Sequence, residues 1–248
     1  MGWLLLLCLG ARAEGGDLRL VTGDDYAPFT GRALPGGGLL TQLVQAALAG
    51  QGVSSTLDWR PWNRGYRMTL QGDYDATFPY VHSDERAADY LYSAVLINVS
   101  QYVFSLAGDE LEADRTESLG GKRLCYPLGW QPPAAIQQMV EQGRLTLHAP
   151  VGLNACARLV LLGRDDFFIA NRPLGEAALR TTGEAGRFRR SQHSFGSSSL
   201  HVIVPRNHPR AERILQQLNA GLARLHERNE YGPMLERYLQ QRHEQAGP

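Results

Sequence analysis

Short apolar strand-like runs and segments with helical spacing alternate along the chain. In the first half, strand-like runs cover 18–22, 55–59 and 75–79, and helix-like segments cover 39–48 and 63–70. The second half repeats this order, with strands at 122–126, 145–148 and 166–170 and helices at 133–142 and 156–162. Such alternation is typical of α/β units around a parallel sheet. The pattern therefore predicts an α/β protein.

A short motif repeats at matching places in the two halves. Residues 70–75 and 161–166 both read Leu-x-Gly-x-x-Asp, and each motif closes a predicted helix and opens an apolar strand. The glycine suits the position just after a helix, where the backbone turns left-handed. Two such turns in two α/β halves predict two similar lobes.

The C-terminal part has helical spacing and no further α/β unit. Its apolar stripe consists of Ile214, Leu215, Leu218, Leu222 and Leu225, and a second short helix is predicted over 231–239. We expect both helices to pack on the first lobe, so that the chain crosses between lobes near 100–106 and near 195–204. Lobe 1 is then 14–103 with 200–248, and lobe 2 is 104–199. A single open sheet with a helical cap is the alternative.

Two apolar stretches bear on export and membrane insertion. Residues 3–10 are apolar and precede Ala11-Arg12-Ala13, as in a secretory signal peptide. Eight residues are too few to span a bilayer, which takes about 20, so we expect a cleaved signal peptide over 1–13; a short buried segment is the alternative. The uncharged stretch 90–107 is rich in β-branched and aromatic residues, which favours two strands over a spanning helix. The mature product is expected to be soluble and periplasmic.

Charge and cysteine content narrow the function further. The 25 basic and 25 acidic residues balance, so no overall field attracts nucleic acid, and a nucleic-acid partner is not expected. After removal of the signal segment, Cys125 and Cys156 remain as an even pair. In an oxidising compartment such a pair predicts a disulfide, and two buried free thiols are the alternative.

Motifs for catalysis and for metal binding are missing from the sequence. It contains no Cys-x-x-Cys, no His-Glu-x-x-His, no Gly-x-Ser-x-Gly and no phosphate-binding loop. The seven histidines are scattered without ligand spacing. We therefore expect no metal, no cofactor and no enzymatic activity.

Six motifs occur in one order that resembles a known family. They are DDYAPF at 24–29, PWNR at 61–64, LQGDYD at 70–75, SDER at 83–86, LGRDD at 162–166 and NEYG at 229–232. In this order they resemble the bacterial extracellular solute-binding proteins of family 3, which include the polar amino acid binders of ABC transporters. The resemblance implies a type II periplasmic binding protein fold, with a ligand enclosed between two lobes joined by a two-strand hinge.

The resemblance also assigns roles to individual residues. Arg86, in the Ser-x-x-Arg segment that begins at Ser83, stands where the amino acid binders hold the ligand carboxylate, and a guanidinium donates two parallel hydrogen bonds to such a group. Tyr26 matches the aromatic residue on the wall of the first lobe. A solvated surface arginine and a core tyrosine are the alternatives.

Three departures from the family pattern argue against an ordinary α-amino acid ligand. Asn171 stands where amino acid binders place the carboxylate that pairs with the ligand ammonium. The second-lobe loop, usually similar to Gly-Thr-Thr, reads Gly-Trp-Gln at 129–131. Phe-Pro-Tyr-Val at 78–81 replaces small, hydroxyl-rich residues.

Aromatic side chains collect near the expected cleft. Tyr26, Trp62, Tyr80 and Trp130 could form stacking walls for a ring or a cationic group. Asp25 or its neighbour Asp24 could then supply a negative charge. For Trp62 and Trp130, plain packing is the alternative.

The sequence as a whole predicts a periplasmic receptor for a small polar ligand, an amino acid or a related carboxylate or amine. We expect a monomer that delivers its ligand to an inner-membrane ABC permease. A ligand-sensing partner of a membrane receptor is one alternative. A periplasmic enzyme similar to cyclohexadienyl dehydratase is another, with Glu176 or Asp166 as its general acid.

Overall fold

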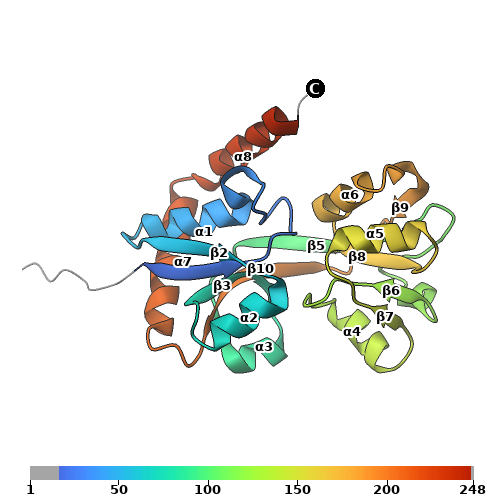
Figure 1. Cartoon of the computed structure of the whole chain (residues 1–248), viewed down its shortest axis with the longest axis horizontal. Helices are drawn as coiled ribbons and strands as arrows, with labels where there is room; N and C mark the ends of the chain where they lie inside the picture. Colours follow the sequence, from blue (N-terminus) through green and yellow to red (C-terminus); the bar gives the residue numbers. More distant parts are fainter. Residues whose placement is uncertain (1–16, 247–248) are drawn as a thin grey trace, which may run out of the picture.

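The computed structural model describes residues 17–246, so the predicted signal peptide at 1–13 lies outside the described residues. Two lobes lie side by side along the long axis of the molecule (Figure 1). Two strands, β5 (Ile97–Leu106) and β10 (Ser197–Pro205), run from one lobe to the other. Within 17–246, no helix combines the length and apolar character that crossing a membrane requires.

The first lobe is a sheet with helices on both faces. Its parallel strands are β1 (Leu18–Thr22), β2 (Ser55–Trp59) and β3 (Ala76–Val81), with β1 in the middle. Antiparallel β10 adds to β3, and short β4 (Tyr90–Tyr92) pairs with β10. The helices are α1 (Leu39–Ala49), α2 (Trp62–Leu70) and α3 (Asp84–Asp89). Figure 1 shows α1 and α2 on opposite faces of the sheet.

The second lobe repeats this plan. Parallel strands β7 (Thr146–His148) and β8 (Phe167–Asn171) flank β6 (Arg123–Cys125). Antiparallel β5 adds to β8, and β9 (Phe188–Arg190) pairs with β5. The helices are α4 (Ala134–Glu141), α5 (Leu153–Leu161) and α6 (Arg172–Arg180). The predicted α/β class and the two lobes are therefore confirmed.

The hydrogen-bonded sheet is continuous across the lobes because β5 changes partner along its length. Residues 97–100 pair with β10, and residues 101–105 pair with β8. The strand order is consequently β2-β1-β3-β10-β5-β8-β6-β7. Only these two strands carry the ladder between the lobes in the described part of the chain, which makes them the place where the molecule could bend.

The repeated Leu-x-Gly-x-x-Asp motif builds the same contact in each lobe. Gly72 and Gly163 follow α2 and α5 with φ of 90° and 67°, the left-handed turn that the motif predicts. Asp75 accepts hydrogen bonds from the backbone N–H and the guanidinium of Arg19, which also donates to the Gly72 carbonyl. We call Arg19, Gly72 and Asp75 the first clasp.

The second clasp consists of Arg123, Gly163 and Asp166. The backbone N–H of Arg123 donates to Asp166 at 2.6 Å, and the Arg123 guanidinium donates to Asp166 and to the Gly163 carbonyl. Each arginine lies on the central strand of its lobe, and each aspartate precedes the neighbouring parallel strand. A clasp therefore ties the turn after a helix to the centre of the sheet.

The C-terminal helices pack on the first lobe, as predicted. Helix α7 (Ala211–Glu227) lies against α1, and α8 (Tyr231–Ala246), longer than the predicted 231–239, also contacts α1. A Cβ on Gly221 would lie 2.0 Å from the Ala47 carbonyl oxygen, so the two helices approach closely at this glycine. The tail thereby buries one face of the first lobe.

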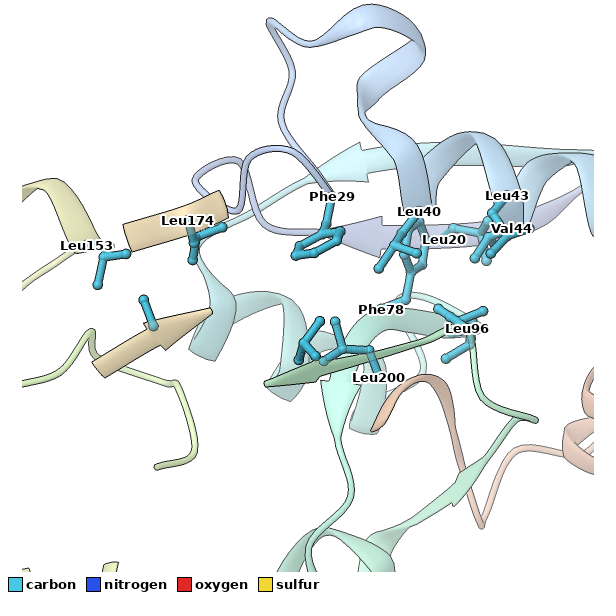
Figure 2. Close-up of a cluster of buried hydrophobic side chains, with 14 of the residues drawn as sticks. Leu20, Phe29, Leu40, Leu43, Val44, Phe78, Leu96, Leu153, Leu174 and Leu200 are labelled. Carbon is cyan, nitrogen blue, oxygen red and sulfur yellow. The ribbon is translucent and has the colours of Figure 1, made fainter. Parts of the chain in front are cut away.

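Figure 2 shows how apolar side chains from several elements fill the interior. Leu20 and Leu40 lie on one side of the cluster, and Phe78 and Leu200 face them from β3 and β10. In the second lobe, Cys125 and Cys156 form the predicted disulfide, which joins β6 to α5 with a Cα–Cα distance of 5.3 Å. The second lobe therefore has a covalent link in addition to its apolar core.

Several elements differ from the sequence-based prediction. Helix α5 begins at Leu153, three residues earlier than predicted, because buried Leu153 belongs to its apolar face. Helix α6 was missed, although Asn171 accepts a hydrogen bond from the Leu174 N–H and a proline stands in its first turn. Asn followed by Pro is a helix-start signal that could have revealed it.

Candidate functional site

A cavity lies between the two lobes, beside the strands that join them. The space between its lining atoms, counted out to its open mouth and including solvent there, is about 500 Å³. Its lining residues are Tyr26, Trp62, Pro79, Tyr80, Val81, Arg86, Gln101, Tyr126, Gly129, Trp130, Gln131, Ala170, Asn171 and Leu200. Both lobes and both joining strands thus contribute to one site.

Three aromatic side chains form the first-lobe wall. Tyr26 sits in the loop after β1, where its backbone N–H donates to the Thr30 carbonyl at 3.1 Å. Trp62 starts α2, and Tyr80 lies near the end of β3. The Trp62 ring meets Tyr26 and Tyr80 edge to face, with centroids 5.9 Å apart in both pairs. Burial raises the pKa of the Tyr26 and Tyr80 hydroxyls, which keeps both neutral.

Arg86 projects into this wall from the first turn of α3. The Ser83 hydroxyl caps the helix by accepting from the Arg86 N–H at 3.3 Å. The guanidinium lies 5.1 Å from the Tyr80 ring centroid, and it donates long hydrogen bonds of 3.4 Å to the carbonyls of Val81 and Gly129. Among the side chains that the structure describes, no carboxylate forms an ion pair with Arg86, and the carbonyl groups to which it donates are neutral.

The second-lobe wall comes from the segment before α4. Trp130 meets Tyr26 edge to face across the lobes, at 5.0 Å between centroids. The Tyr126 hydroxyl donates to the Gln131 carbonyl at 3.1 Å. The helix predicted over 133–142 is α4, which begins at Ala134 after the non-helical Pro133 (φ −51°, ψ 144°). The tryptophan therefore sits on a loop.

The neighbouring strands β5 and β8 supply the polar floor. Asn171, the last residue of β8, uses its Oδ1 to accept from the Leu174 N–H at 3.1 Å, and its side chain also interacts with the Tyr26 hydroxyl. Gln101 on β5 lies opposite, with its Oε1 3.5 Å from the Tyr126 hydroxyl. Sequence reasoning missed Gln101 and Tyr126. Gln101 is a polar residue within an apolar strand, and that break in the pattern could have revealed it.

Two of the predicted site residues lie outside the cavity. Ser83 caps α3, the helix that carries Arg86, and does not itself line the cavity. Asp25 lies at the mouth of the cleft, where its carboxylate accepts from Trp62 Nε1 at 2.6 Å. Loss of solvation by the surrounding protein raises the pKa of the Asp25 carboxyl more than the hydrogen bond from Trp62 lowers it. Asp25 therefore holds the Trp62 ring, and Ser83 holds the helix that carries Arg86.

Two groups of metal-ligating side chains come together elsewhere in the described chain, which the scattered histidines did not predict. One combines Cys125, His148 and Asp165, and the other combines Glu112, Asp114 and His193. In the first group, the Cys125 sulfur is bonded to Cys156 and is not available as a thiolate. In the second, Glu112 is paired with Arg189. Neither group lies in the cavity.

Comparison with known proteins gives no match by sequence but clear matches by structure. No protein-family model and no curated protein sequence matches this chain. An ancestral arginine-binding protein bound to arginine, however, has a TM-score of 0.78 over 90% of this chain and 98% of its own, at 16% identity. The GluR0 ligand-binding core from Nostoc punctiforme, in complex with L-glutamate, has a TM-score of 0.73 over 89% and 98%, also at 16% identity.

The chain has the fold of the two-lobed periplasmic binding proteins. A histidine kinase sensor domain with similarity to periplasmic binding proteins shares it, at 19% identity and a TM-score of 0.75, over 90% of this chain and 96% of the domain. These neighbours confirm the fold that the resemblance of the six motifs implied. At such low identity they establish the fold, and this periplasmic binding protein fold explains why the cavity lies between the lobes.

Proposed function

We propose that this protein is a periplasmic solute-binding protein that encloses a small ligand between its lobes and delivers it to an inner-membrane ABC permease. One observation carries the proposal: a single cavity draws side chains from both lobes and from both joining strands. A ligand that touches both lobes stabilises the closed arrangement, because it gains contacts there that an open arrangement lacks. Several of the structural neighbours bind amino acids, which supports this role.

The moving bodies in this proposal are the lobes expected from the sequence, 14–103 with 200–248 and 104–199. Contacts across the cleft in the cavity region include the Arg86 bond to Gly129 and the contact of Tyr26 with Trp130. Opening around β5 and β10 would break these contacts. The chain is proposed to act as a monomer.

Arg86 is proposed to bind the acidic group of the ligand. A planar guanidinium that faces a cavity without an ion-pair partner is suited to a carboxylate. Tyr26, Tyr80, Trp62 and Trp130 are proposed to enclose the rest of the ligand, and Asn171 to accept or donate a hydrogen bond. Asp25 and Ser83 are proposed to act indirectly, through Trp62 and α3.

The test combines a thermal-shift screen of carboxylates, amino acids and amines with small-angle scattering. A ligand at 100 times its dissociation constant adds about 2.7 kcal/mol of stability. We expect a compound that raises the melting temperature also to reduce the radius of gyration. An unchanged scattering curve with a saturating, confirmed ligand would contradict closure.

The same ligand then tests Arg86. Arg86→Ala leaves a bound carboxylate unpaired, which costs about 2 to 5 kcal/mol and weakens binding by roughly 30-fold or more. Arg64→Ala is the matched control, because Arg64 is an exposed arginine of α2 that does not line the cavity. Equal affinities of the two variants would remove Arg86 from the site.

Ligand sensing is a second candidate function, favoured by the structural likeness to a histidine kinase sensor domain. Both functions need ligand-induced closure, and they differ in the membrane partner. Pull-down of a permease or of a receptor kinase by the liganded protein distinguishes them. For an enzyme similar to cyclohexadienyl dehydratase, the expected acids are poorly placed: Asp166 belongs to the second clasp and Glu176 pairs with Arg172 on α6, and neither lines the cavity.

A further inference from the structure

We infer that the ligand is a small carboxylate with a flat apolar body and no ammonium group; this inference rests on the proposed solute-binding function. The starting point is the charge of the cavity. Arg86 is the only charged side chain among the described lining residues. Arg86 is half-buried and has no ion-pair partner among the described side chains, so the cavity favours a ligand that brings one negative charge and no positive one.

An ammonium group on the ligand would find no charged partner. The Asn171 amide stands in the floor of the cavity, and its oxygen already caps α6. Asp25 is on the other side of Trp62, where its carboxylate accepts from the indole N–H. Glu85 is exposed and lines a neighbouring hollow together with Arg86. An ammonium in the cavity would therefore lose water without gaining a carboxylate.

The aromatic walls do not make the cavity favourable for an ammonium group either. Aromatic faces attract cations, but the guanidinium of Arg86 already lies 5.1 Å from the Tyr80 ring centroid and 6.0 Å from that of Tyr66. A second cation in the same cavity would be repelled by Arg86. The walls instead suit a flat apolar group, because rings pack well edge to face against other rings.

The flat body fits what the lining offers. Trp130 contacts both Tyr26 and Tyr126 edge to face, with centroids 5.0 and 6.0 Å apart, and Trp62 contacts Tyr26 and Tyr80. These rings belong to both lobes, so a planar group inserted between them would touch both. The carboxylate end would meet Arg86, and the planar end would meet the tryptophans.

Three probes with the same phenyl group on a two-carbon chain test the charge requirement. They are 3-phenylpropanoate, L-phenylalanine and 2-phenylethylamine, which carry the carboxylate alone, both charged groups and the ammonium alone. A second set with an aliphatic skeleton is 4-methylpentanoate, L-leucine and isopentylamine. Calorimetry is expected to show the carboxylate of a set binding at least tenfold tighter than its amino acid, and the amine not binding.

Asn171→Asp sharpens the test, because it places a carboxylate at the floor of the cavity and preserves the helix cap, which aspartate also provides. We expect this variant to weaken 3-phenylpropanoate binding and to narrow or reverse the preference over L-phenylalanine. Asn98→Asp is the matched control, since Asn98 is exposed on β5, outside the cavity, and changes the net charge equally. The control is expected to keep the original preference.

The outcomes separate the inference from the proposed function. An amino acid that binds within threefold of its carboxylate, or an amine that binds at all, overturns the inference. If such a compound also reduces the radius of gyration, the solute-binding function stands. Failure of 3-phenylpropanoate to bind, or tighter binding of 4-methylpentanoate than of 3-phenylpropanoate, overturns the inference as well. An unchanged preference in Asn171→Asp contradicts the assignment of the cavity floor.

Discussion

The two clasps share one geometry, but they differ in how the rest of the molecule surrounds them. In the first clasp the Asp75 side chain is 4% exposed, and His208 and Arg210 from the segment before α7 lie against it. In the second clasp the Asp166 side chain is 27% exposed and has Arg123 as its partner. The C-terminal segment therefore buries the aspartate of the first clasp, whereas the aspartate of the second clasp stays partly exposed.

The comparison indicates that each lobe secures the same turn by a different means. The Nδ1 of His208 accepts from the Arg210 N–H at 3.1 Å, so its Nε2 carries the proton donated to Asp75 at 2.9 Å. The second lobe has no tail of this kind and is closed instead by the disulfide between Cys125 and Cys156. The first clasp depends on polar contacts to a buried aspartate, and the second lobe has a covalent bond.

Removal of the disulfide is expected to have the largest effect. The bridged residues are 31 positions apart, and in the chain-entropy model such a loop contributes about 3 to 4 kcal/mol. Cys125→Ala combined with Cys156→Ala should lower the free energy of unfolding by about this amount. Hydrogen exchange should rise in the second lobe and stay near its original level in the first. Equal loss of protection in both lobes would contradict separate stabilisation.

Asp75→Ala is expected to have the second-largest effect. It should lower the free energy of unfolding by about 3 kcal/mol, because buried donors lose a charged acceptor. The hydrogen bonds from Arg19 and His208 outweigh the effect of burial and lower the pKa of Asp75. A lowered carboxyl pKa contributes stability above about pH 4 that is lost as the pH falls further. Denaturation at pH 7 and pH 3 should therefore show a smaller difference between the variant and the original protein at pH 3.

Asp166→Ala should cost less, about 1 kcal/mol, because solvent screens the exposed pair. The hydrogen bond from the Arg123 guanidinium is the main cause that lowers the pKa of Asp166, so this contribution also disappears in acid. Denaturation of both aspartate variants in guanidinium chloride shows which of the two loses more stability. A loss as large as that of Asp75→Ala would mean that burial by the tail adds nothing.

Local patterns predicted most of this architecture. The limits of β1 and β2 match their apolar runs, and the two glycine turns follow from the repeated motif. The partners of the clasps could not be predicted, because Arg19 and Asp75 meet only when two strands distant in sequence become neighbours. His208 joins them from still farther along the chain.

The site was also predictable only in part, because its shape depends on contacts between residues distant in sequence. Motif resemblance named Arg86, Tyr26 and Asn171, which the structure brings to one cavity. It could not separate Asp25 from that cavity, because the separation depends on how the Trp62 ring is turned. A sequence shows that charged residues stand near a loop. Whether such a residue adds its charge to the cavity depends on the side of the neighbouring aromatic ring on which it lies.

The smallest expected difference lies between the two clasp glycines. A Cβ at either position would meet open space, so replacement by alanine acts through the backbone, and a side chain in left-handed conformation costs about 1 kcal/mol. Asparagine tolerates that region better, especially near a φ of about 57°. Gly163, with φ of 67°, should accept asparagine with less loss than Gly72, with φ of 90°. Thermal denaturation of the four single variants measures this. Larger losses from asparagine than from alanine at Gly163 would mean that the second clasp does not hold the left-handed turn.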